Sequence, residues 1–137
     1  MKNEIILFEN QEVKLEVNMK DETVWLTQTQ MAQLFDRDVK TISKHIKNAF
    51  EEELDRKSNS QKMQIPNSDK SVNIYDLDVI ISVDYRVKSN NGVIFRKWAN
   101  KILKDYLIKG YVVNNKRLEY LEKTVKLIDI ASRIELN

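Results

Sequence analysis

Residues 26–46 read LTQTQMAQLFDRDVKTISKHI. At the start of this stretch the spacing of the apolar residues changes from that of a strand to that of a helix. Thr27 with Gln30 three residues later has the spacing of a capping box, in which each side chain binds a backbone N–H at a helix start. Apolar residues follow at helical spacing as far as Phe35. The pattern predicts a short helix that is interrupted at Asp36.

A second helix is expected from about Val39 to Leu54. Its inward residues recur about every four positions: Val39, Ile42, Ile46, Phe50 and Leu54. Its exposed face is polar and basic, with almost no acid before Phe50: Lys40, Thr41, Ser43, Lys44, Lys47 and Asn48.

This pair of segments has the pattern of a helix-turn-helix. Ala32 supplies the small residue that lets the second helix cross close to the first, and Ile42 supplies an apolar inner contact. Asp36 stands where glycine is usual in the turn, but aspartate tolerates a left-handed backbone. His45 stands where an apolar residue is more usual, and we expect Ile46 to take that role. Two packed amphipathic helices with no DNA-binding role would share the apolar pattern, whereas the cap, Ala32 and the basic face favour DNA binding.

Upstream, the sequence predicts a β-hairpin. Residues 4–8 (EIILF) are typical of a short strand, and residues 12–17 (EVKLEV) alternate strictly between apolar and charged side chains. We expect a polar turn over residues 19–23 and a further strand over residues 24–26.

Downstream, residues 55–62 (DRKSNSQK) are expected to form a loop, and residues 62–75 to form a second hairpin with a polar tip. A hairpin soon after the second helix is the layout of a winged helix, in which the hairpin lies along the DNA backbone. A plain structural hairpin would have the same composition, so both interpretations stay open here. The side chains that could contact DNA are Lys62, Gln64, Asn67 and Lys70.

The rest of the chain is expected to be helical. Asp76 should cap a short apolar helix, and Asn90 or Asn91 a longer one from about Gly92 to Lys109, which Gly110 should end. A last helix should start near Asn115, with Leu118, Leu121, Val125 and Ile128 at 3-4-3 spacing. Arg86 and Lys88 should either touch the DNA backbone or lie in a solvated loop.

The expected fold is therefore α+β: a winged helix-turn-helix with an N-terminal β-hairpin and a C-terminal helical extension. We place the winged domain at residues 1–90 and the extension at 91–137, where it packs on that domain and offers a dimer surface.

Composition narrows the class of protein. The 137 residues include no cysteine, which excludes disulfides and cysteine-ligated zinc, and only two glycines and one proline, which favours helices. The net charge of +2 is too small for a protein that coats nucleic acid irrespective of its sequence. Without a signal peptide or a long apolar segment we expect a cytoplasmic protein, and without a catalytic signature we expect no enzyme, metal or cofactor.

The residues predict that the chain binds double-stranded DNA in a sequence-directed manner. Lys40, Thr41, Ser43 and Lys44 should read base edges, and Gln28 and Thr29 should bind phosphate at the start of the first helix. Arg37, Lys47, Asn48 and the four hairpin residues complete the expected contacts. A homodimer is expected because one recognition helix reads few base pairs. The alternative is a protein-interaction or antitoxin-like module that neutralises a partner protein.

Four blocks resemble the N-terminal part of the RhuM family of bacterial virulence-island and mobile-element proteins: WLTQTQMAQLF, HIKNAFEEEL, IYDLDVIISVDYRVKS and GVIFRKWANKILKDYLIKGY. The third block is the most specific, because its apolar run with polar flanks is not generic. The resemblance covers nearly the whole chain and implies a DNA-binding role, such as a transcriptional regulator. A toxin-like protein partner is also implied.

Overall fold

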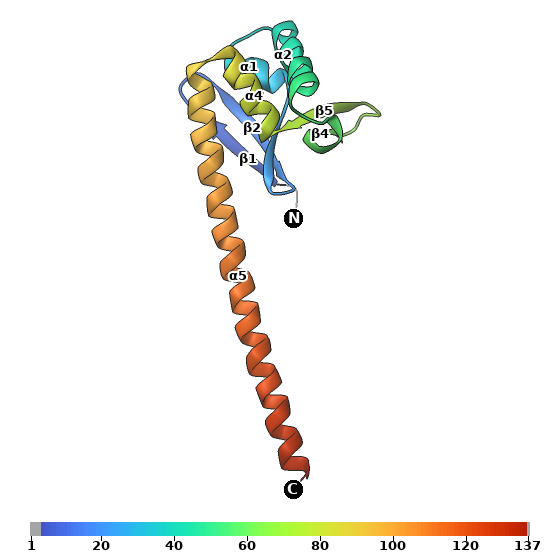
Figure 1. Cartoon of the computed structure of the whole chain (residues 1–137), viewed down its shortest axis with the longest axis vertical. Helices are drawn as coiled ribbons and strands as arrows, with labels where there is room; N and C mark the ends of the chain where they lie inside the picture. The colour runs from blue at the N-terminus through green and yellow to red at the C-terminus, as the bar shows by residue number, and fades with distance from the viewer. Residues whose placement is uncertain (1–3, 137) are drawn as a thin grey trace. The chain divides into compact units, whose positions relative to one another are not determined.

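A computed structural model describes residues 4–136, without the side chains of residues 111–115 and 132–136. It is a mixed α+β protein built on one antiparallel five-stranded sheet, with the strand order β1-β2-β3-β5-β4 (Figure 1). The elements follow one another as β1 (Glu4–Glu9), β2 (Lys14–Lys20), β3 (Thr23–Thr27), α1 (Gln28–Phe35), α2 (Val39–Glu52), α3 (Arg56–Asn59), β4 (Ser60–Gln64), β5 (Ser71–Asp76), α4 (Leu77–Val87) and α5 (Asn90–Leu136).

The chain divides into two compact units within α5, after Asn100. The first unit holds the sheet, the helices α1 to α4 and the start of α5. The described part of the second unit is a single helix, the continuation of α5 from Lys101.

The N-terminal hairpin is confirmed, with a tighter turn than the sequence predicts. β2 runs on to Lys20, so that Met19 lies in the strand and is 1% exposed. Only Asp21 and Glu22 form the turn, with φ of 52° and 62°. Positive φ at both central residues matches the twist of a two-residue hairpin, and this allows the strands to extend further than expected.

An aromatic cluster joins the first strand, β1, to the start of α5. The ring of Phe8 in β1 stacks on that of Phe95 at a centroid distance of 5.2 Å and meets the edge of Trp98 at 5.2 Å. Phe8 and Phe95 are at most 1% exposed. The other tryptophan, Trp25, is buried in β3 and donates its indole N–H to the Lys20 carbonyl at 2.9 Å. Trp25 is thus part of the core, whereas Trp98 is half-buried at the edge of the aromatic cluster.

α5 approaches α4 closely at Gly92. A Cβ atom on Gly92 would lie 1.7 Å from Oδ1 of Asp84 and 3.1 Å from Cε1 of Phe35. Asp84 is buried, and burial raises the pKa of its carboxyl group, which the nearby Arg96 side chain at 3.3 Å opposes. Because the Ser89 hydroxyl accepts the Gly92 N–H at 3.1 Å, α5 begins at Asn90 instead of Gly92.

Two further expectations are wrong. The segment expected to be a loop contains α3 and the start of β4, because the Asp55 side chain accepts the Lys57 N–H and the Ser58 hydroxyl and so caps a short helix. Gly110 does not end a helix, since α5 runs through it to Leu136 and no glycine has a positive φ. A glycine inside a helix costs only about 1 kcal/mol relative to alanine, too little to break a long helix by itself.

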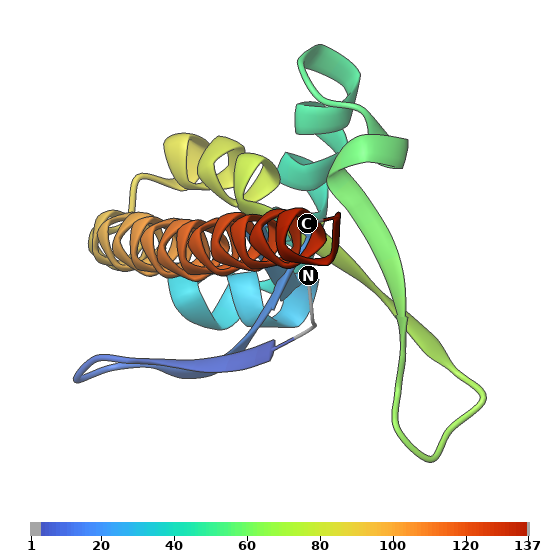
Figure 2. The same ribbon diagram turned by 90° about the horizontal axis from the view of Figure 1, so that it is seen from below.

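The second hairpin is formed by β4 and β5, paired from Ser60–Tyr75 to Gln64–Ser71. Its tip extends away from the helices of the first unit (Figure 2). At its base, the Tyr75 ring lies 6.1 Å from the ring of Phe50 in α2, over which the Arg56 guanidinium stacks at 4.5 Å. β5 also pairs with β3, so the hairpin is part of the main sheet.

Candidate nucleic-acid interface

α2 presents two chemically opposite sides. The Asp38 side chain caps the helix by accepting the Thr41 N–H at 2.7 Å, a hydrogen bond that lowers the pKa of this carboxyl group. Ile42, Ile46 and Ala49 are at most 4% exposed and form the inward side. The predicted inward positions are confirmed for Ile42 and Ile46, whereas Phe50 is half-buried and Leu54 lies beyond the end of α2 at Glu52.

The outward side of α2 carries three exposed lysines, Lys40, Lys44 and Lys47. At about 100° per residue, their side chains fall within an arc of about 60°, opposite the buried residues. Ser43 is exposed beside them, whereas Thr41 and Asn48 are half-buried on the flank. The first turn of α2 contains no acid, so the capping Asp38 is the carboxylate nearest to Lys40 and Lys44 along the helix.

Val39 departs from the predicted pattern, because it is 46% exposed although its spacing predicts an inward position. As the first residue of α2, it precedes the point where the helix packs on its neighbours. Its carbonyl oxygen accepts a hydrogen bond from the Gln28 side-chain amide at 3.0 Å. This contact joins the N-terminus of α2 to the N-terminus of α1.

The start of α1 has the local chemistry that the sequence predicts. The Thr27 hydroxyl accepts the Gln30 N–H at 3.1 Å, and the Gln30 side chain accepts the Thr27 N–H at 2.9 Å, which completes the capping box. Gln28 is half-buried and Thr29 is exposed at the first two positions of the helix. Because the Gln28 side chain also contacts Val39, the N-termini of α1 and α2 lie on the same side of the helix pair.

The turn between α1 and α2 depends on Asp36 and Arg37. Asp36 adopts the left-handed conformation, with φ 53° and ψ 54°, and donates its N–H to the Ala32 carbonyl. The Arg37 guanidinium donates to the carbonyl oxygens of Phe35, Asp36 and Val87 at 2.9–3.1 Å. Arg37 thus binds the C-terminal ends of α1 and α4, a role for which its sequence position gives no signal.

The hairpin side chains are exposed. They are Lys62 and Gln64 on β4 and Asn67 and Lys70 in the loop that follows. The Ile65 N–H donates to the Lys70 carbonyl at 3.0 Å and closes the loop, in which Asn67 has φ 61°. The Gln64 amide donates to the Ser68 carbonyl at 3.2 Å and is partly engaged within the loop. The loop conformation thus leaves both lysines accessible to a ligand.

Arg86 lies in α4 and not in a loop, and its side chain, 18% exposed, is paired within the first unit. Its guanidinium lies 2.6 Å from Glu52 and 3.1 Å from Glu53, while the Ser82 hydroxyl donates to Glu53 at 2.6 Å. These contacts raise the pKa of Arg86 and lower that of Glu53. They tie the end of α2 to α4, a pairing between distant residues that periodicity does not reveal. Lys88 is exposed and ends α4 in the left-handed conformation.

His45 lies half-buried on the flank of α2, and Ile46 takes the fully inward place, as expected. Its Nδ1 atom is buried without a hydrogen-bond partner among the residues that the structure describes. Burial lowers the pKa of His45, and the positive charges of Arg86, Lys44 and Arg37 lower it further. The neutral imidazole is therefore the form that the folded protein favours.

We expect the free energy of unfolding to fall as the pH is lowered through the unfolded-state pKa of His45, about 6.5. A lowered pKa means that the unfolded chain binds the proton more readily, so this contribution is complete above that pH and is lost below it. His45 is the only histidine, so the loss should be absent from His45→Leu. Urea unfolding of both proteins between neutral and mildly acidic pH tests this, and a constant difference between them would contradict it.

Residues 4–100 thus form an α+β unit that presents a cationic helix and an exposed hairpin. The chain belongs to the virulence protein RhuM family, whose profile matches residues 53–129, more than half of the sequence. The matched region contains α3, β4, β5, α4 and most of α5, whereas α1 and α2 precede it. The search of curated proteins and the search of solved structures found no match.

The helices differ from membrane-spanning segments in their composition. Within residues 4–136, none of them, α5 included, combines the length and the apolar character that crossing a bilayer requires.

Proposed function

We propose that this chain binds double-stranded DNA in a sequence-directed manner through a winged helix-turn-helix, and that it regulates transcription within a mobile element or virulence island. α2 is the proposed recognition helix, and the β4–β5 hairpin is the proposed wing. The observation that carries the proposal is the set of three lysines on α2, opposite its buried side.

The topology supports a winged helix. One strand, two helices and a hairpin follow in the order β3, α1, α2, β4, β5, interrupted only by the four residues of α3. In the sheet, β3 neighbours β5 and β5 neighbours β4. The hairpin is thus fixed beside the helix pair through β3, as a wing requires.

The proposed contacts divide by role. Lys40, Thr41, Ser43 and Lys44 lie in the first half of α2, the part of a recognition helix that reaches base edges. Phosphate contacts come from Gln28, Thr29, Lys47, Asn48 and the hairpin residues Lys62, Gln64, Asn67 and Lys70. Arg37 is exposed and belongs to this group as well, because the three carbonyl oxygens that its guanidinium binds occupy only three of its five N–H donors.

The test is a mobility-shift titration of mixed-sequence duplex DNA at several salt concentrations, comparing the wild type with Lys40→Ala/Lys44→Ala. We expect the double variant to bind about tenfold or more weakly. The slope of log K against log salt should decrease by about 0.9 for each phosphate that the variant no longer neutralises. A selection from random duplexes then tests sequence preference.

The matched control is Lys97→Ala/Lys101→Ala, which removes the same charge at the same spacing from two positions of α5 outside the proposed interface. This control should bind like the wild type. Equal binding by the α2 variant and the wild type at low salt would contradict the proposal. If the chain shifted no duplex DNA in the gel but bound a protein with an affinity independent of salt, the alternative of a protein-interaction module would be favoured instead.

A further inference from the structure

The second unit leaves an apolar surface uncovered. Leu118, Leu121, Val125 and Ile128 lie on the C-terminal part of α5 and are 56–64% exposed. The described part of this unit is one helix, so it has no other element within the unit to cover these side chains. A helix in water draws most of its stability from packing of its apolar face, which indicates a partner.

The spacing of these residues specifies the kind of partner. Separations of three, four and three residues follow the a and d positions of a heptad, with Leu118 and Val125 at a and Leu121 and Ile128 at d. Such a seam packs against another helix with the same repeat.

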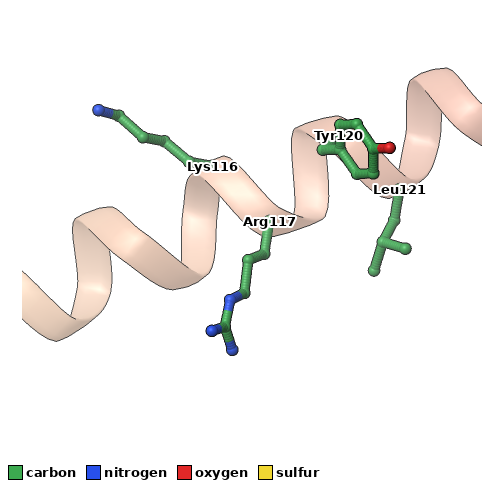
Figure 3. A pocket seen from close by; sticks show the side chains of 4 residues that line it. All are labelled: Lys116, Arg117, Tyr120 and Leu121. Carbon is green, nitrogen blue, oxygen red and sulfur yellow. The ribbon is translucent and has the colours of Figure 1, made fainter.

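A shallow, open hollow lies on the helix surface beside the start of the seam. Figure 3 shows Lys116 and Tyr120 along one row and Arg117 and Leu121 along the next. These four residues line a hollow of about 420 Å³. Leu121 is the one lining residue that belongs to the seam, so the hollow lies at the edge of the seam, on the side of Arg117.

We propose that residues 117–128 pair with the same segment of a second copy of this chain as a parallel two-stranded coiled coil. The charged residues beside the seam favour a second copy as the partner and a parallel arrangement of the two helices. Arg117 occupies position g and Glu122 the following position e, so a parallel pair sets each Arg117 against Glu122 of the other copy. An antiparallel pair would oppose e positions, which are both acidic here, Glu122 and Asp129.

The proposal does not depend on DNA binding and is tested without DNA. The full chain should sediment at about twice its 16.2 kDa mass across a wide range of concentrations. Leu121→Lys should lower the mass to that of one chain. Leu127→Lys is the matched control, because Leu127 is 67% exposed but lies outside the seam, so this variant should remain a dimer.

Unchanged tryptophan fluorescence in Leu121→Lys verifies that the first unit, which contains both tryptophans, stays folded. A monomeric wild type, or equal dissociation of the two variants, would overturn the proposal. A mass of three or four chains would overturn the two-stranded arrangement.

The relative direction of the two helices is tested by disulfide cross-linking. The chain has no cysteine of its own, so an introduced cysteine can pair only with the same cysteine in a second copy. Leu118→Cys and Ile128→Cys lie about 15 Å apart along the helix at 1.5 Å per residue. In a parallel pair each variant should form a disulfide-linked dimer on mild oxidation, because each position faces itself. In an antiparallel pair at most one position can face itself, so failure of either variant to cross-link would overturn the parallel direction.

Discussion

Phe8→Ala is expected to destabilise the first unit by about 3–5 kcal/mol, the range for removing a fully buried phenylalanine ring. The ring is 1% exposed and contacts both Phe95 and Trp98, so its loss leaves a cavity bounded by two other aromatic side chains. A small domain has only about 5–15 kcal/mol of stability in all, so the variant should be much easier to unfold with urea. Trp98 fluorescence reports the change directly.

The matched control is Leu7→Ala in the same strand. Leu7 is the neighbouring residue, points to the other side of β1 and is 50% exposed, so its truncation should change the stability by less than about 0.5 kcal/mol. A similar loss of stability in both variants would mean that strand pairing, and not the aromatic cluster, holds the N-terminal hairpin in place.

Gly92→Ala is expected to destabilise the first unit by about 1–3 kcal/mol, the usual cost of forcing extra atoms into a packed core. The added methyl group would overlap the Asp84 carboxylate, and the buried Asp84 side chain cannot move aside without losing Arg96. Urea unfolding of the full chain measures the loss.

Gly110→Ala in the same helix should have the opposite effect. No atom lies within 4 Å of the Cβ position at Gly110, so alanine should stabilise the helix by up to about 1 kcal/mol, measured by circular dichroism. Asp84→Ala combined with Gly92→Ala should lose less stability than the sum of the two single changes, because the overlapping atoms are gone. Additive losses would mean that the close approach is not what Gly92 provides.

The elements predicted best from the sequence are those set by local chemistry. The capping box of Thr27 and Gln30, the left-handed Asp36 and the cap at Asp76 each depend on residues within four positions of one another, and the structure has all of them. Helical periodicity also predicts the basic side of α2 and the buried Ile42 and Ile46, but not the exposure of Val39 at the first position.

The features that the sequence does not predict are mainly those set by contacts between residues far apart in the chain. The Arg37 guanidinium binds the Val87 carbonyl, which is fifty residues away, and the sequence gives no sign of this contact. Arg86 is bound by acids that lie more than thirty residues upstream of it. Gly110 suggests a helix end by its identity alone, whereas its cost of about 1 kcal/mol is too small to end a long helix. Side-chain pairings across the fold leave no trace in a single sequence.

Under the proposed function, the hydrogen bond from the Gln28 amide to the Val39 carbonyl bears on how fast DNA would bind. It joins the starts of α1 and α2 without a ligand, while the capping box and Asp38 order the first turn of each helix. The conformational entropy of ordering this surface is therefore lost during folding and not again on association. A ligand that fits the preorganised helix pair needs no rearrangement step, so its association rate should be limited by diffusion and orientation.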